Sequence, residues 1–518
     1  MISSIRYLGH AGFIIEHRGI SLLIDPWFHS AFLQSWFPYP DNRYLLSEVK
    51  QGHFHYLYVS HAHEDHYDER LLSTLDRSIT VIAPKYRSKV MVRRFRGLGF
   101  ANIVPLDHKQ SLELGPGLTA TMYLDTSHKE DSGLLIEIDG LRFLDLNDCN
   151  TPMSELPGNI DILAAQFSGA MWYPNCYDYP PSIMGEKVAA VRQGLMDTLY
   201  RKVRLTGARA YIPSAGPACF LDPALERYND RAETIFPHWE DVSGDFAEAC
   251  PEVAVLRLYP GDKVPIEDGR FVVDHMRDAR THENLVEYRE RRREEWGEFY
   301  ASPEKAVTPS EIEAYFSTLQ RRNQHLIHDF RKDITLVSGE NTWQVRLGSL
   351  AEHFVIDGEE PYDPEYKLII SPRVLRAILE GKTGWEEALL SMRVDLHRDP
   401  DVFDLKFMSL LRYGNEPAQT LQLMREQSVT ETIERDGLRM QRYCPHAGED
   451  LAHAIIRDGI IECPRHHWCW DARTGECVAG GAIRLRVEVL DSNAPALHVA
   501  ADADPQYTTL RTREMREA

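Results

Sequence analysis

The sequence predicts an α/β fold for the N-terminal half of the chain, an α+β fold for the middle and an all-β fold for the C-terminal part. Three observations support this prediction: apolar runs alternate with turn signals at the start, helix-capping patterns follow, and short strands with clustered cysteines come last. At 518 residues the chain is long enough for about three domains. We place their bounds at 1–268, 269–415 and 416–505, with 506–518 as a tail.

The first part contains apolar runs that look like buried strands ending in polar loops. The clearest are YLYVS at 56–60, TVIAP at 80–84 and ILAAQ at 162–166. A longer stretch at 133–148 contains Asp139-Gly140 between two apolar runs, which predicts a hairpin. Because loops at strand ends usually present binding and catalytic groups, these loops are the first candidates for a site.

Helix signals dominate the middle part. Thr308-Pro-Ser-Glu311 is a capping box with proline at the first helical position, and apolar residues follow at helical spacing. Ser371-Pro372 starts a second predicted helix, and 385–390 forms a third. The charged stretch EYRERRREEW at 287–296 is expected to be a solvated helix or linker.

The C-terminal part carries two short metal-ligand patterns. Cys444-Pro-His446 and Cys463-Pro-Arg-His466 flank a predicted hairpin at 455–461. Two thiolates and two imidazoles on two loops are the ligands of a Rieske [2Fe–2S] cluster, and the same four residues could hold a structural zinc ion. His467 is an adjacent, off-register alternative to His466.

These loops resemble those of the Rieske family, because Gly448 follows the first pair and Trp468 follows the second. Since no further cysteine stands at 447–449, the resemblance is to the oxygenase and ferredoxin subtype rather than to the respiratory type. It implies an all-β Rieske domain that transfers single electrons and in which Cys469 and Cys477 are not ligands.

A denser group of potential ligands follows the apolar run that ends at Val59. His61-Ala-His63-Glu-Asp65-His66 offers four metal-binding side chains within six residues, which leaves little room for a packing explanation. The pattern resembles that of the metallo-β-lactamase fold superfamily. The resemblance implies a four-layer αββα sandwich with two neighbouring metal ions.

The same resemblance assigns roles to residues further along the chain. Asp25 would contact a ligand histidine and orient its ring without binding the metal itself. His128 would be the ligand of the third motif, and Asp148 would bridge the two metal ions, with Asp145 as the competing candidate.

The last metal ligand has no clear counterpart. Superfamily members usually supply a histidine after a late strand, but the stretch 211–216 contains none. His238 is the best remaining candidate, against the alternative of an ordinary histidine, and His10 would at most line the pocket.

The combination of the two metal motifs indicates the reaction class. A dinuclear centre of histidines and carboxylates hydrolyses esters when it holds zinc and can reduce O2 when it holds iron. An electron relay in the same chain is useful only beside a centre that accepts electrons, and zinc accepts none. We therefore expect a nonheme diiron monooxygenase. Its catalytic residues would be His61, His63, Asp65, His66, His128 and Asp148.

Together the two modules resemble the CMP-N-acetylneuraminate hydroxylase-like family of monooxygenases. The resemblance includes 147–149, 167–170 and 213–217, and 368–413 resembles a sterol-carrier-like region. It implies hydroxylation of a C–H bond of a small molecule, either a nucleotide sugar or a natural product. Sialate hydroxylases place the Rieske domain first, whereas here it is last, so bacterial natural-product hydroxylases are an equally good guide to the substrate.

The resemblance also implies cofactors and partners. The cofactors are a Rieske cluster and two iron ions, which zinc could replace on purification, with O2 as co-substrate. A ferredoxin or similar donor with its reductase would supply electrons, and a homo-oligomer would let the cluster of one subunit serve the next. The cluster ligands would be Cys444, His446, Cys463 and His466.

The composition of the chain limits its expected cellular location and the classes of partner that it could bind. The 79 acidic against 58 basic residues, a net charge of −21, argue against a nucleic-acid partner. Since the sequence shows neither an apolar run of about 18 residues nor a signal-peptide pattern, we expect a cytoplasmic, non-membrane protein.

Three alternative functions remain open. A dinuclear zinc hydrolase with a regulatory Rieske domain would use the same N-terminal ligands. An O2 or NO reductase resembling the flavodiiron enzymes would need a flavodoxin-like glycine-rich segment, which is not evident. A non-catalytic electron carrier would not need the second metal site.

Overall fold

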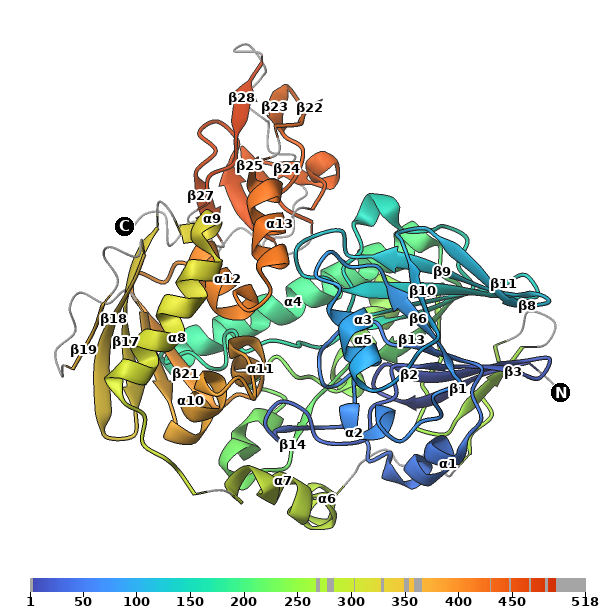
Figure 1. Ribbon diagram of the computed structural model, residues 1–518. Helices are drawn as coiled ribbons and strands as arrows, with labels where there is room; N and C mark the ends of the chain where they lie inside the picture. Colours follow the sequence, from blue (N-terminus) through green and yellow to red (C-terminus); the bar gives the residue numbers. More distant parts are fainter. Residues whose placement is uncertain are drawn as a thin grey trace. The chain divides into compact units, whose positions relative to one another are not determined.

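The computed structural model describes residues 3–266, 271–276, 284–301, 303–327, 330–348, 354–357, 366–428, 430–446, 449–464, 467–479 and 483–490 (Figure 1). The chain divides into two compact units, Met1–Ser428 and Val429–Ala518. The larger unit contains the predicted N-terminal part, all of the predicted middle part and residues 416–428, which the sequence analysis assigned to the C-terminal part; the predicted borders at 268 and 415 stay predictions.

Two seven-stranded sheets form the centre of the larger unit. The first has the order β16-β1-β2-β3-β5-β6-β7 and the second the order β15-β13-β12-β11-β10-β9-β8. The strands of the first sheet are β1 (Ser4–Gly9), β2 (Gly12–His17), β3 (Ile20–Ile24), β5 (Tyr56–Tyr58), β6 (Thr80–Pro84), β7 (Ile103–Leu106) and β16 (Lys263–Pro265). Those of the second are β8 (Ser111–Gly115), β9 (Leu118–Leu124), β10 (Ser132–Ile138), β11 (Leu141–Asn147), β12 (Ile162–Gln166), β13 (Ala210–Ser214) and β15 (Ala254–Val255).

The two sheets pack face to face and carry helices on their outer faces. Phe13 of the first sheet and Phe143 of the second pack in one buried cluster, with ring centroids 5.3 Å apart. Because neighbouring residues of a strand point to opposite faces, Leu134 joins this shared core while Leu135 packs under the outer helices. The predicted αββα sandwich is therefore confirmed. Its outer helices are α1 (Leu46–Gln51), α2 (Glu69–Leu72), α3 (Val90–Gly97), α4 (Pro181–Thr206) and α5 (Trp239–Ala249).

The predicted hairpin at Asp139-Gly140 is present between β10 and β11. Ile138 pairs with Leu141 in the ladder, so the turn has two residues. Asp139 and Gly140 have φ angles of 48° and 93°, the positive values that a tight antiparallel hairpin requires at both positions.

The middle of the chain forms a five-stranded sheet with the order β19-β18-β17-β20-β21, together with several helices. This is the α+β architecture that the sequence predicted, and the resemblance to a sterol-carrier protein stays a prediction. Its strands are β17 (Arg331–Ser338), β18 (Asn341–Gly348), β19 (Phe354–Asp357), β20 (Tyr366–Ile370) and β21 (Val394–Arg398). Its helices are α8 (Pro309–Arg322), α9 (Gln324–Ile327), α10 (Pro372–Leu379), α11 (Trp385–Leu390), α12 (Leu405–Tyr413) and α13 (Pro417–Ser428).

The charged stretch at 287–296 departs from the expected solvated helix. It lies in α6 (Leu285–Arg291) and α7 (Arg293–Gly297), but Arg292 is buried, pairs with Glu295 at 2.8 Å and donates to the carbonyl of Phe28 at 2.9 Å. The sequence could not reveal the contact with Phe28, because that residue precedes Arg292 by 264 positions in the chain. Two short strands, β4 (Trp36–Phe37) and β14 (Cys219–Phe220), pair with each other, and their residues Phe37 and Cys219 share a buried cluster with Tyr288 of α6.

The smaller unit consists of two small antiparallel sheets, which agrees with the all-β prediction. One contains β22 (Thr432–Arg435), β23 (Leu438–Gln441) and β28 (Val487–Val489). The other contains the predicted hairpin as its first two strands: β24 (Ile455–Arg457), β25 (Ile460–Glu462), β26 (Cys469–Asp471) and β27 (Cys477–Ala479).

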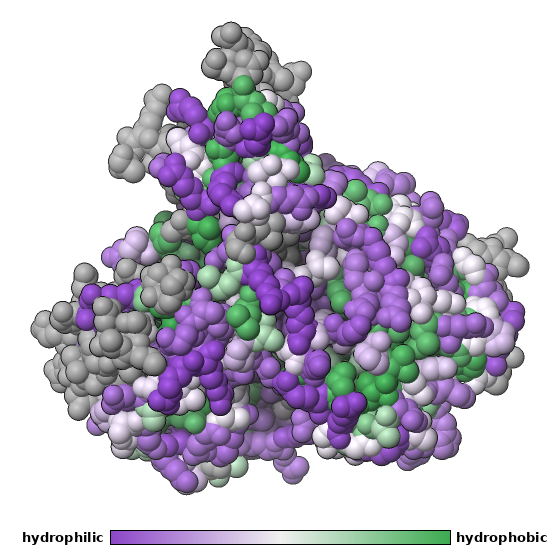
Figure 2. All heavy atoms as spheres, turned by 45° about the horizontal axis from the view of Figure 1, so that its top comes forward, coloured by the Kyte–Doolittle hydropathy of each residue, from purple (hydrophilic) through white to green (hydrophobic). Residues whose placement is uncertain are grey.

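One face of the molecule is mainly hydrophilic. On the face drawn in Figure 2, hydrophilic residues predominate and hydrophobic ones form smaller patches among them. Among the helices that the structure describes, none combines the length and hydropathy needed to cross a bilayer.

Candidate metal centre

The histidine-rich motif occupies the loop between β5 and α2. The backbone amides of His66 and Tyr67 both donate to the carbonyl of His63, at 3.1 and 2.7 Å, and this turn folds the motif back on itself. Because β3 and β5 are parallel neighbours, Asp25 at the end of β3 lies beside the loop. The Asp25 carboxylate accepts from the Ser60 amide at 2.8 Å and contacts Nδ1 of His66 at 2.8 Å.

One group of potential ligands joins the motif to the second sheet. Single atoms of His61, His66 and Asp148 lie within 4.8 Å of one another. Asp148 follows β11, and its two oxygens lie 3.5 Å from His66 Nε2 and 3.9 Å from His61 Nε2. His63 Nδ1 lies 2.8 Å from His61 Nε2, so His63 also reaches this group.

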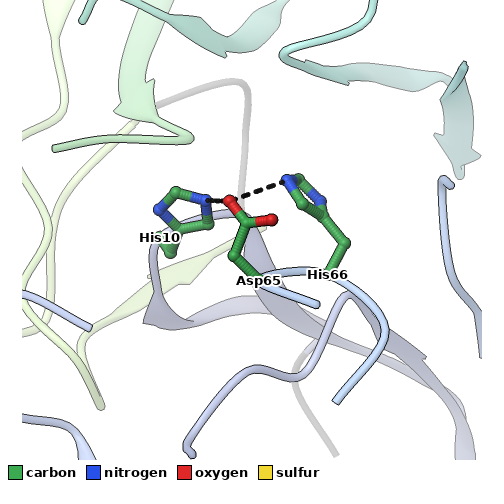
Figure 3. A group of neighbouring side chains, drawn as sticks. All are labelled: His10, Asp65 and His66. Carbon is green, nitrogen blue, oxygen red and sulfur yellow. Dashed lines mark ion pairs between the residues drawn. The ribbon is translucent and has the colours of Figure 1, made fainter. Parts of the chain in front are cut away.

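A second group consists of His10, Asp65 and His66, and Figure 3 shows the Asp65 carboxylate between the two imidazole rings. Asp65 Oδ2 lies 3.2 Å from His10 Nε2 and 3.8 Å from His66 Nε2. His66 belongs to both groups, so two metal positions would be neighbours. The sequence analysis placed His10 at most as a pocket-lining residue; in the structure it lies between Gly9 and Gly12 in the β1–β2 hairpin with a φ of 54°, and a ligand role for it is a proposal.

Three predicted candidates lie outside both groups. His128 contacts Glu426 through Nδ1 at 2.9 Å, and its ring packs against Tyr413. His238 stands at the N-terminus of α5 with its ring 4.3 Å from that of Tyr39. Asp145 is fully buried, and burial raises the pKa of its carboxyl well above the ordinary value. A ligand role for His128 or His238 stays a prediction.

The chemistry of the two groups fits divalent metal ions. Asp65 Oδ1, His66 Nε2 and Asp148 Oδ1 are buried, and within the described part of the chain they have no hydrogen-bond partner. A buried polar atom without a partner costs free energy that a metal ion would recover. Imidazole nitrogens and carboxylate oxygens are ligands that both zinc and iron accept.

The electrostatics of the centre also favour a cation. Burial lowers the pKa of His66, yet the carboxylates of Asp148, Asp65 and Asp25 raise it well above the ordinary value. Burial likewise lowers the pKa of His63, but contact with Glu386 and the nearby Asp65 and Asp148 raises it to about 9. The carboxylates therefore stabilise positive charge near His63 and His66, and metal ions would supply that charge in place of protons.

The smaller unit brings the two cysteine loops together. Cys444 and Cys463 are buried, and no disulfide joins any of the eight cysteines, all of which lie in described residues. Cys444 Sγ lies 4.0 Å from His446 Nδ1, and the His446 ring stacks on Trp468 of the second loop with centroids 4.1 Å apart. His466 lies outside the described residues. Two buried thiols beside an imidazole fit the cysteine end and one histidine of a Rieske cluster.

The remaining candidates in these loops have other contacts. His467, the off-register alternative, contacts Glu462 through Nδ1 at 2.6 Å. Cys469 Sγ donates to the carbonyl of His467, and Cys477 Sγ donates to that of Ala479, both at 3.3 Å.

Two protein families match the chain. Residues 4–177 match the β-lactamase superfamily domain, and residues 413–487 match the Rieske [2Fe-2S] domain. The chain is 27% identical over 529 residues to a "Putative Rieske 2Fe-2S iron-sulfur protein" of Mycolicibacterium smegmatis, an alignment that covers 93% of this chain and 99% of the relative.

Two relatives named as enzymes match shorter segments. The 4-amino-L-phenylalanyl-[CmlP-peptidyl-carrier-protein] 3-hydroxylase of Streptomyces venezuelae is 31% identical over 120 residues, which is 21% of each chain. The aminopyrrolnitrin oxygenase PrnD of Pseudomonas fluorescens is 51% identical over 39 residues, 8% of this chain and 10% of the relative.

Proposed function

Because the chain joins a metallo-β-lactamase fold to a Rieske domain, we propose that it is an O2-dependent nonheme iron monooxygenase that hydroxylates a C–H bond of a small molecule. The observation that carries the proposal is the presence of both sites in one chain. A one-electron relay has a purpose only if its partner site accepts electrons, which iron does and zinc does not. Relatives named as a hydroxylase and an oxygenase support the same reaction class.

The proposed centre divides the ligands between two iron ions. His61 and His63 with Asp148 and the predicted ligand His128 would hold one ion, and Asp65 and His66 with Asp148 and His10 would hold the other. Bound iron would supply the activation of O2. The chain's own contribution is a set of carboxylates, among them the fully buried Asp25, that contact the imidazole rings and would fix their orientation.

Electrons would reach the centre from outside through the smaller unit. Cys444, His446, Cys463 and the predicted ligand His466 would hold the [2Fe–2S] cluster, which a ferredoxin or similar donor with its reductase would reduce. A natural product or a nucleotide sugar is the proposed substrate class. The carrier-protein-bound amino acid in the name of the Streptomyces relative supports the first of these.

The test of this proposal does not require the substrate. The iron-loaded protein is expected to take up about three electrons per chain in an anaerobic titration, one for the cluster and one for each iron, and to return them on exposure to O2. Protein with zinc in the N-terminal centre should take up about one. Equal uptake by the two forms would favour the dinuclear zinc hydrolase, the second candidate, which the match to the β-lactamase superfamily supports.

With a substrate in hand, the source of oxygen gives a further test. Product made under labelled O2 should contain the label, and anaerobic protein should form none. Turnover by the zinc form without O2 or reductant, at the rate of the iron form, would refute the oxygenase proposal.

The last metal ligand is tested by comparing two histidines. His10→Ala is expected to reduce the metal bound by the N-terminal centre from about two ions to about one, because His10 Nε2 lies 3.2 Å from Asp65 in the second group. His238→Ala should retain both ions. Metal analysis of the two purified variants, with the visible absorption of the cluster as a check on folding, distinguishes the assignments. Loss of metal only in His238→Ala would support the sequence-based prediction that His238 is the last metal ligand.

A further inference from the structure

Each of the four predicted ligand histidines contacts a carboxylate through one ring nitrogen. This pattern was expected only for Asp25. Two partners come from the metallo-β-lactamase fold itself, and the other two come from the middle of the chain. The contacts are His66 Nδ1 to Asp25 at 2.8 Å, His61 Nδ1 to Asp131 at 3.2 Å, His63 Nε2 to Glu386 at 3.8 Å, and His128 Nδ1 to Glu426 at 2.9 Å.

In each of the first three histidines one ring nitrogen faces a carboxylate partner and the other faces the proposed ligand group. In His66 and His61, Nδ1 meets the carboxylate and Nε2 lies near Asp148. In His63 the roles are reversed, because Nδ1 faces His61 Nε2 while Nε2 faces Glu386. A metal-binding histidine commonly donates its second N–H to a carboxylate, which fixes the tautomer and the ring orientation. The contact through Nδ1 of His128 likewise leaves Nε2 as its available nitrogen.

The carboxylate that faces His63 is held firmly in place. Glu386 stands on α11, and its side chain is only 12% exposed. Arg412 of α12 donates through Nε to Glu386 at 3.0 Å and also stacks over the ring of Trp172. The end of α11 is fixed to the N-terminal part as well, because Trp36 Nε1 donates to the carbonyl of Leu390 at 2.8 Å. Glu386 is thus largely shielded from solvent and held by its contact with Arg412.

Helix α13 contacts His128 at two points, the ring and the backbone carbonyl. Glu426 of α13 meets the ring, and Gln419 of the same helix donates through Nε2 to the backbone carbonyl of His128 at 3.1 Å. His128 is buried and the Glu426 side chain is 14% exposed, so solvent screens this pair weakly. One helix therefore sets both the position and the ring orientation of His128.

We propose that helices α11 and α13 of the middle segment complete the N-terminal metal centre, with Glu386 and Glu426 as positioning residues that hold His63 and His128 by the nitrogen facing away from the metal. This inference rests on the proposed metal centre, but it does not depend on the reaction with O2. It gives the segment a role that its predicted likeness to a sterol carrier did not suggest.

Glutamine substitutions test the proposal in the full-length protein. Glu386→Gln and Glu426→Gln keep the shape of each side chain but remove the negative charge that faces the imidazole nitrogen, at 3.8 Å for Glu386 and 2.9 Å for Glu426. Each is expected to weaken Co²⁺ binding at the N-terminal centre about 10- to 100-fold in a chelator competition and to shift the visible bands of bound Co²⁺. Glu386→Asp and Glu426→Asp should recover part of the affinity, because they retain the charge.

Glu416→Gln is the matched control. Glu416 forms an ion pair with Arg93, which also links the middle segment to the N-terminal part but touches none of the four histidines. This variant should bind Co²⁺ like the unmodified protein. Wild-type affinity and an unchanged Co²⁺ spectrum in both Glu386→Gln and Glu426→Gln would overturn the proposal.

A measurement on the unmodified protein covers the case in which a variant does not fold. Proton NMR of the Co²⁺ form should show shifted, slowly exchanging imidazole N–H signals from His63 and His128, because a carboxylate shields each proton from water. Rapid exchange of both signals would refute the inference while leaving the metal centre intact. Failure to bind Co²⁺ at all would instead refute the proposed centre, and with it this inference.

Discussion

Cys463→Ser is expected to remove the visible absorption of the iron–sulfur cluster and all turnover that depends on a reductase. Cys463 is fully buried, its backbone amide is tied to the carbonyl of Trp468 at 2.8 Å, and its thiolate would be one of only two on the same iron. Metal in the N-terminal centre should stay at the wild-type level, because the two proposed sites share no ligand. Absorption spectroscopy and metal analysis on one preparation measure both effects.

Cys477→Ser is the control for this substitution. Cys477 lies in the same small sheet but is partly exposed, and its sulfur donates to a backbone carbonyl. The cluster should survive in this variant. Persistence of the absorption in Cys463→Ser, or its loss in Cys477→Ser, would show that the cluster ligands are assigned wrongly.

Asp148→Asn is expected to abolish product formation while leaving a cluster that can still be reduced. The two oxygens of Asp148 face His66 and His61, so this carboxylate serves both proposed metal positions. An amide cannot bridge two cations in the same way, and we expect the N-terminal centre to lose most of its metal. Metal analysis, dithionite reduction of the cluster and product assays together check the result.

Asp145→Asn provides a stringent comparison. Asp145 was the competing candidate for the bridging role, but it lies outside both ligand groups, and its Oδ1 accepts from the Asn147 amide at 3.2 Å, a contact that an asparagine oxygen can keep. This variant should keep its metal and its activity. An emptied centre in Asp145→Asn together with a full one in Asp148→Asn would reverse the assignment.

Local patterns allowed the reliable predictions. The turn at Asp139-Gly140, the capped helix that begins at Pro309 and the hairpin between the cysteine loops are each specified by a few adjacent residues. The cluster from His61 to His66 was visible for the same reason, since one tight turn gathers its side chains. Such features do not depend on the rest of the fold.

The parts that the sequence did not reveal depend on contacts between distant segments. Glu386 and Glu426 lie on ordinary amphipathic helices, and nothing in their spacing distinguishes them from surface glutamates. His10 approaches Asp65 because the β1–β2 hairpin and β5, which precedes the motif loop, lie in one sheet with only β3 between them. Arg292 is buried for a similar reason, within a stretch whose composition indicated solvent exposure.

The contact between Glu386 and His63 has a consequence for how such chains can be recombined. A crossover anywhere between 66 and 386 would inherit the histidines from one parent and their charged partner from the other. Exchange of the middle segment to alter substrate choice would therefore succeed only with donors that carry acidic residues at the positions of Glu386 and Glu426 and an arginine at that of Arg412. In this architecture the residues that must be exchanged together reach beyond the segment 4–177 that matches the β-lactamase superfamily domain.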